Sequence, residues 1–241
     1  MKEKSFEDYS KNFYNLCLKK KNYKKESEVV KSLIKFFQKK PSKTLLDAGC
    51  GIGEHLKYLS KNFRCVGIDI NKDAIEIAKT NVLNADFKVA NLIKFDLNKN
   101  FDVLICLFSS VSYVQTFDNL VKALKNFYIH LKNKGLLIIE PWMFKKEFNR
   151  WYLGFDAFSD KKVKFIRFTL SKVVKSKWLL IMHYFIEEDG KIKHFREVHE
   201  LLNLDCQDYI KALNTAGFKE VKFLNKKFWE GNRGLFIATK Y

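Results

Sequence analysis

The stretch that decides the fold is Leu45-Leu46-Asp47-Ala48-Gly49-Cys50-Gly51-Ile52-Gly53. A short apolar strand, residues 44–48, runs directly into a turn that has glycine at every second position. Glycine lets a ligand approach the backbone, and the helix expected after the turn would present its N-terminal amides to that ligand. By itself the pattern is shared by dinucleotide-binding folds, so it predicts a ligand site without naming the ligand.

Strands and helices alternate on both sides of this turn. Apolar residues at helical spacing predict two helices within residues 5–38, and Asn71 is a good N-cap for a later helix. The other expected helices are 54–62, 72–82, 117–132 and 206–216, and the other expected strands are 64–70, 85–90, 101–107, 135–140, 218–224 and 234–239. This alternation predicts an α/β fold, a doubly wound, mostly parallel seven-stranded sheet of the Rossmann-like kind.

The alternation stops between residues 142 and 204. Residues 162–203 form long β-favouring runs without a helix, and Glu188-Asp189-Gly190 is a typical hairpin turn. We therefore expect a core made of residues 1–141 and 205–241, which includes the N-terminal helices. A small antiparallel β insertion, residues 142–204, would cover the substrate and could also supply a dimer surface.

Two acids indicate the kind of ligand. Asp47 lies at the end of its strand, where a carboxylate would repel a pyrophosphate but could hold an ammonium group. Asp69 ends the next strand, in Val66-Gly67-Ile68-Asp69-Ile70, where it can accept hydrogen bonds from a ribose diol. A cofactor that carries a ribose and a positively charged amino acid fits both acids better than NAD does.

LLDAGCGIG, followed by VGIDI at residues 66–70, resembles motif I and its successor in class I S-adenosylmethionine-dependent methyltransferases. The resemblance implies S-adenosylmethionine as cofactor, with Asp47 and Gly49 at its methionine end. Asp69 would bind the ribose, and Ile70 would lie under the adenine. Asn91 and Leu92 fall where the family reads the adenine amino group, although Asn91 replaces the usual acid. The implied cofactor-binding residues are Tyr14, Tyr23, Asp47, Gly49, Gly51, Asp69, Ile70, Asn91, Leu92 and Leu107.

The remaining segments point to one branch of that family. FDVLICLFSSVSYV (101–114), GLLIIEPWMF (135–144) and RGLFIATK (233–240) resemble the enzymes that dimethylate amino groups on nucleotide-linked deoxyamino sugars, of the desosamine and mycaminose type. The insertion and the N-terminal DYSKNFYNLCLKKKNYKKESE match theirs in place and character. By this resemblance Tyr14 and Tyr23 line the cofactor and substrate cleft, and Arg233 would clamp a diphosphate.

Two positions depart from that branch. Tyr113 stands where those enzymes often have a histidine that is a candidate base, and Trp142-Met143 replaces a Trp-Trp pair. An amine needs only its free lone pair to accept a methyl group, so alignment can supply much of the rate without a strong base. The candidate catalytic residues are Tyr14 and Tyr113, and the candidate substrate-binding residues are Trp142, His183 and Arg233. For each of them, packing or surface exposure is the alternative role.

Further polar residues lie in the same segments. His194 and His199 are five apart, so on one strand they face opposite sides and cannot form a simple metal pair. One histidine of the insertion could still face the substrate. Glu140 could accept a proton or cap a following helix. The five cysteines include no CxxC pair, and three lie in apolar runs, so we expect neither a metal site nor a disulfide framework.

Composition limits the alternatives. The net charge is +18, but it comes from 40 Lys and only 5 Arg, whereas specific nucleic-acid contacts favour Arg. Pro41 and Pro141 form neither an Asn-Pro-Pro-Tyr nor a Pro-Cys signature of base methylation. We expect a cytoplasmic enzyme that acts on a nucleotide-sugar amine, first once and then twice, with no nucleic-acid or membrane partner. A glycine- or sarcosine-type N-methyltransferase and an RNA-binding or RNA-methylating protein are the alternatives.

Overall fold

The computed structural model describes residues 21–38, 40–145, 151–159, 164–174, 177–188, 190–225 and 233–241. The predictions for Tyr14 and for the first N-terminal helix lie outside these residues. Within the described part of the chain, no helix is long and apolar enough to cross a membrane.

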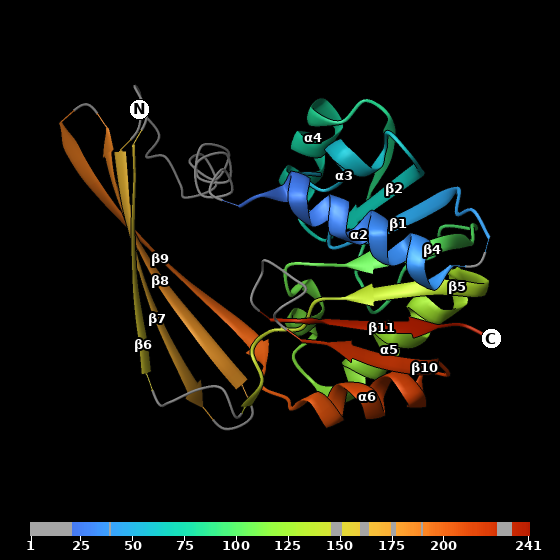
Figure 1. Ribbon diagram of the computed structural model, residues 1–241. Helices are drawn as coiled ribbons and strands as arrows, with labels where there is room; N and C mark the ends of the chain where they lie inside the picture. The colour runs from blue at the N-terminus through green and yellow to red at the C-terminus, as the bar shows by residue number, and fades with distance from the viewer. Residues whose placement is uncertain are drawn as a thin grey trace.

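A seven-stranded sheet forms the core, with the order β10-β11-β5-β4-β1-β2-β3 (Figure 1). The strands are β1 (Thr44–Ala48), β2 (Arg64–Asp69), β3 (Ala85–Val89), β4 (Phe101–Cys106), β5 (Leu131–Ile139), β10 (Lys219–Leu224) and β11 (Leu235–Thr239). Strands β1 to β5 pair in parallel, and β11 runs antiparallel to both β5 and β10. The predicted doubly wound, mostly parallel sheet is confirmed.

Helices cover both faces of this sheet because successive strand residues point to opposite sides. Leu45 of β1 packs in a cluster with residues of α2 (Tyr23–Phe37), α3 (Leu56–Leu59) and α4 (Lys72–Asn81). Its neighbour Leu46 packs in a second cluster with residues of α5 (Phe117–Ile129) and α6 (Cys206–Thr215). The core is thus two apolar layers, one on each side of a sheet that is buried on both faces.

Local hydrogen bonds explain where these helices begin and end. The Asn71 side chain accepts from the backbone N–H groups of Asp73 and Ala74, which confirms the predicted cap of α4. Helix α3 is shorter than expected because the Leu59 carbonyl accepts from the backbone N–H groups of Asn62 and Phe63 in a tight turn. Helix α5 ends at Ile129, and β5 begins at Leu131 rather than at residue 135, because Leu131 pairs with Phe101 of β4.

The insertion is a four-stranded antiparallel sheet in the order β6-β7-β8-β9. Its strands are β6 (Trp151–Ser159), β7 (Lys164–Val174), β8 (Lys177–Glu188) and β9 (Lys191–Leu202). The expected antiparallel insertion is confirmed, and it begins one strand earlier than the β-favouring runs at 162–203 indicated. Figure 1 shows this sheet beside the ends of β4 and β5 toward which their arrows point.

Candidate active site

The site lies at the carboxyl ends of β1, β2 and β4, where ligands bind in wound sheets. The carboxylate of Asp69 holds the glycine-rich turn, since its Oδ2 accepts from the Gly51 N–H at 2.8 Å. Its Oδ1 accepts from the Asn71 N–H at 2.9 Å. The acid at the end of β2 and the turn after β1 therefore form one rigid unit. Each carboxylate oxygen keeps a further lone pair for another donor.

Two glycines of the turn are required for different reasons. Gly49 has φ +85°, and a Cβ there would lie 2.4 Å from Cβ of Ser110, so the chain's own packing against the loop after β4 demands glycine. Gly51 has φ +52°, and a Cβ there would meet no atom within 4 Å. The backbone at Gly51 therefore faces open space, which is what a ligand at this turn needs.

Asp47 is buried, and its Oδ2 has no hydrogen-bond partner among the described residues. Burial raises the pKa of Asp47 to about 7, with nearby His55 lowering it and Asp69 adding to the increase. A buried carboxylate without a partner costs free energy, which a positively charged ligand group would recover. Next to Asp69, the side chain of Ile70 is 69% exposed, an apolar surface suited to a planar base. These residues fit S-adenosylmethionine.

The rim beyond β3 carries the other expected adenine contacts. The exposed Asn91 accepts from the Ile93 N–H through its Oδ1 at 2.9 Å, and Leu92 is half-buried against the core. The Ala90 N–H donates to the Asp69 carbonyl, which fixes this rim beside Asp69. On the other side of β1, Leu107 is buried at the end of β4.

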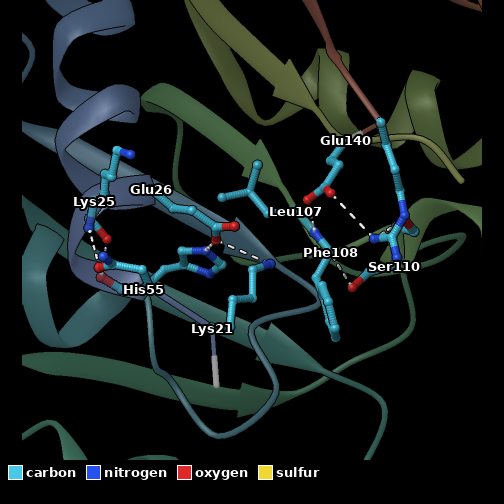
Figure 2. Close-up of polar contacts among 12 residues, drawn as sticks. Lys21, Lys25, Glu26, His55, Leu107, Phe108, Ser110 and Glu140 are labelled. Carbon is cyan, nitrogen blue, oxygen red and sulfur yellow. Dashed lines mark hydrogen bonds and ion pairs between the residues drawn. The ribbon is translucent and has the colours of Figure 1, made fainter. Parts of the chain in front are cut away.

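A buried polar cluster beside the turn was not predicted (Figure 2). Glu26 of α2 has an Oε2 that lies 2.8 Å from His55 Nε2 and 3.1 Å from Lys21 Nζ. Although burial opposes ionisation, the hydrogen bond from His55 and the charge of Lys21 lower the pKa of Glu26. Glu26 and His55 are far apart in sequence, so no spacing could have paired them. The only local signal was that His55 lies two residues after the last glycine of the turn.

Tyr23, an expected cofactor contact, belongs to this cluster. Its ring meets the ring of His55 edge-on at a centroid distance of 4.9 Å. Burial, and then the negative charge of Glu26, raise the pKa of the Tyr23 phenol, so it stays protonated at neutral pH. Its hydroxyl is therefore available as a hydrogen-bond donor.

The loop after β4 has a strained backbone that buried contacts hold in place. Phe108 and Ser109 have φ of 51° and 63°, and left-handed conformations at non-glycine residues cost about 1–3 kcal/mol each. Buried Glu140 accepts from the Phe108 N–H at 2.7 Å, and the Ser109 hydroxyl donates to the Pro141 carbonyl at 2.8 Å. Strain kept by such contacts is common where a loop must place a functional group. The 3-10 helix η2 (Ser110–Val114), which carries Tyr113, follows directly.

Arg233 completes the anchoring of this loop. It donates to Glu140 Oε1 at 3.3 Å and to the Ser109 hydroxyl at 3.2 Å. Its guanidinium carbon lies 4.2 Å from the centroid of the Trp142 ring. Arg233 is therefore not an exposed turn residue, and Glu140 pairs with Arg233 and with the backbone of Phe108.

Tyr113 reaches across to the insertion. Its hydroxyl lies 3.0 Å from Nδ1 of His199 on β9. His183 lies on the other face of the same sheet, because it pairs with Arg196, three residues from His199. There His183 Nδ1 lies 2.9 Å from His194 Nε2. Among the described residues, His199 is thus the insertion histidine that is bonded to η2 of the core, and a substrate contact of His183 stays a prediction.

No group of three or more His, Cys, Asp or Glu that could hold a metal ion occurs in the described ranges. Cys50, Cys65 and Cys106 are buried free thiols in the core, as predicted.

Comparison with known proteins agrees with this geometry. Residues 45–135 match the methyltransferase domain family. The chain is 27% identical over 224 residues to dTDP-3-amino-3,4,6-trideoxy-alpha-D-glucopyranose N,N-dimethyltransferase of Streptomyces venezuelae, covering 91% of this chain and 92% of that protein. It is 29% identical over 202 residues to dTDP-4-amino-2,3,4,6-tetradeoxy-D-glucose N,N-dimethyltransferase of Saccharopolyspora spinosa, covering 83% and 79%. The solved structure of the sugar N-methyltransferase KedS8 from Streptoalloteichus superposes with a TM-score of 0.87 at 26% identity, covering 96% of this chain and 92% of that one.

Fold, turn and family match together define a class I methyltransferase whose cofactor is S-adenosylmethionine. Within this class the chain resembles, over nearly its whole length, the dTDP-amino-sugar N,N-dimethyltransferases.

Proposed function

We propose that this enzyme methylates the amino group of a dTDP-linked deoxyamino sugar, first once and then twice. The observation that carries the proposal is the similarity to enzymes of that activity across 91% of the chain, insertion included. When bound, S-adenosylmethionine supplies an electrophilic methyl group, whose carbon–sulfur bond breaks as the amine nitrogen bonds to it. The relatives act on 3-amino and on 4-amino sugars, so the position of the amine is not part of the proposal.

Different residues of the site contact different parts of the cofactor in this proposal. Asp47 holds the ammonium of the cofactor, Asp69 its ribose, and Ile70, Asn91 and Leu92 its adenine. Support comes from the unpaired Oδ2 of Asp47, the open space at Gly51 and the exposed Ile70.

Arg233 and Trp142 meet the nucleotide end of the sugar substrate. Arg233 has five N–H donors, of which Nη1 faces Glu140 and Ser109, so others remain for a phosphate oxygen. Tyr113, which is half-exposed, orients the amine. Tyr14 has the same role in this proposal on the strength of the resemblance alone.

The insertion, residues 142–204, covers the substrate with one face and forms a homodimer with the other. Support for the dimer comes from alternating apolar residues on β6, β7 and β9, whose side chains share one side of the sheet by register. We call this set the apolar face: Leu153, Phe155, Ile166, Phe168, Ile192 and Val198. Leu153 and Ile192 are 70% and 73% exposed, and contiguous apolar surface of this kind marks protein–protein contacts.

The test is a panel of dTDP-amino sugars incubated with the enzyme and S-adenosylmethionine, with products weighed by mass spectrometry. Successive mass gains corresponding to one and two methyl groups support the proposal. Methylation of glycine or sarcosine but of no nucleotide sugar would contradict it. Binding of plain dTDP separates the two activities, because a small-amine enzyme needs no diphosphate contact. Salt-resistant retention of RNA would instead favour an RNA substrate.

A further inference from the structure

Tyr113 and His199 are joined across the boundary between core and insertion. The hydroxyl of Tyr113 lies 3.0 Å from His199 Nδ1, and the two rings meet edge-on at 5.7 Å. His199 Nε2 in turn lies 3.4 Å from Glu197 Oε2 on the same strand. Tyr113, His199 and Glu197 therefore form a chain of polar groups that starts on η2 of the core and ends on the insertion sheet.

With the Tyr113 hydroxyl taken as the donor to His199 Nδ1, the other protons of this chain follow. A phenol hydroxyl that donates to Nδ1 requires that nitrogen to be bare, so the neutral imidazole carries its proton on Nε2. Nε2 is the nitrogen that faces Glu197, and a carboxylate there would stabilise the ring once both nitrogens are protonated. The order hydroxyl, imidazole, carboxylate also occurs in enzymes in which a base activates a hydroxyl group and an acid orients the base.

A proton acceptor beside the amine adds to the rate that alignment supplies, because it raises the fraction of bound amine with a free lone pair. A sugar amine arrives largely as an ammonium at neutral pH and has no lone pair until it loses a proton. After the first methylation the product is again an ammonium, so a second methylation needs a second deprotonation. Tyr113 alone is a poor acceptor, because the usual pKa of a phenol is near 10.

We propose that His199, positioned by Glu197, is the proton acceptor that acts through Tyr113 in this reaction. The amine passes a proton to the Tyr113 oxygen while the phenolic proton moves to His199 Nδ1. The side chain of His199 is 30% exposed, so the imidazolium then releases its proton to water and the relay is reset. The sum is one proton moved from substrate to solvent per methyl group.

This inference rests on the proposed function and explains how the insertion takes part in it. The core supplies Tyr113, and the insertion supplies the base. His199 is a positioning and proton-accepting residue, and Tyr113 is the group that touches the amine.

The first test follows the pH dependence of His199→Gln with a dTDP-amino sugar that the wild type methylates. Glutamine keeps a hydrogen-bonding group but cannot accept a proton, so kcat at pH 7 should fall about 10- to 100-fold. The loss should shrink as pH rises above the amine's own pKa, because the substrate then arrives neutral, while the KM for S-adenosylmethionine stays the same. Unchanged kcat, or a loss equal at every pH, would overturn the proposal.

Two further variants test the order of the chain. Glu197→Gln should lower kcat less than His199→Gln, with the same pH recovery. Its matched control is Glu200→Gln on the same strand, whose carboxylate pairs with Lys177 on the other face and whose kcat should match wild type. In the double variant Tyr113→Phe with His199→Gln, the loss should not exceed that of the larger single variant, because both act in one relay. Additive losses would contradict the relay.

A measurement on the wild-type protein needs no sugar substrate and separates the two proposals. In the complex with S-adenosylhomocysteine, imidazole ¹⁵N shifts of neutral His199 should show a bare Nδ1 and a protonated Nε2. The reverse tautomer would overturn the relay even if the enzyme methylates amino sugars. If no nucleotide sugar is methylated, the proposed function fails, and this spectrum still decides the state of the Tyr113–His199 pair.

Discussion

Arg233 donates to the buried carboxylate of Glu140 across 3.3 Å, and the same carboxylate accepts from the backbone of Phe108. One acid therefore ties the last strand of the core to the strained loop after β4. This pair joins buried groups, and Arg233 also lies over the ring of Trp142, so its disturbance should affect stability and substrate binding differently.

We expect Arg233→Ala to destabilise the protein by about 3–5 kcal/mol, because it leaves Glu140 buried without its cation. Arg233→Lys should keep most of the stability but raise the KM for a dTDP-amino sugar, since an ammonium cannot replace the planar fork. Cofactor affinity should change little in the lysine variant. Denaturant unfolding and steady-state kinetics measure the two effects. Normal sugar kinetics in the lysine variant would remove the diphosphate contact from Arg233.

Asp69→Ala should abolish the thermal stabilisation that the cofactor gives. At a hundredfold excess over Kd, S-adenosylhomocysteine should stabilise the wild type by about 2.7 kcal/mol, or roughly 5–10 °C in Tm. Removal of Asp69 loses the ribose contact and frees the Gly51 N–H. Asp86→Ala, an exposed acid on the next strand, is the control and should behave as wild type. A wild-type protein indifferent to the ligand would contradict the assignment.

Asp47→Asn should make the ligand-free protein more stable at pH 8 and weaken its cofactor binding. Because the folded pKa is raised from 3.8 to about 7, the folded state binds the extra proton between these values. Stability from this group is thus complete below pH 3.8 and is lost as pH rises through 7. The gain in Tm from the substitution should be several degrees at pH 8 and clearly smaller at pH 5. Affinity for S-adenosylhomocysteine should fall about tenfold or more, measured by calorimetry.

Phe168→Lys should convert the proposed dimer to a monomer, because it places a charge in the middle of the apolar face. Light scattering at several protein concentrations measures the change. Leu83→Lys is the matched control, since Leu83 is exposed on the core and outside the apolar face. A wild-type protein that is monomeric at all concentrations would contradict the dimer.

Much of the fold could be predicted because it depends on local patterns. Short strand-favouring segments that alternate with helical patterns predicted all seven core strands. The predicted N-cap Asn71 also caps its helix in the structure. The predicted element boundaries were wrong where pairing with a neighbouring strand outweighed the local preference of the residues. The sequence predicts helix to residue 132 and a strand only from residue 135, yet β5 runs from Leu131 because Leu131 pairs with Phe101.

Part of the site could likewise be predicted from local sequence, and part could not. Asp47, Gly51 and Asp69 lie in one motif or at the end of adjacent strands, so the sequence by itself determined their class of cofactor. Only the tertiary structure decided the contacts between Glu26 and His55, between Glu140 and Arg233, and between Tyr113 and His199. The physical reason is the separation of the partners along the chain. A turn and the strands beside it are set by neighbouring residues, whereas these pairs span 29, 93 and 86 residues and exist only once the sheet and the insertion have been assembled.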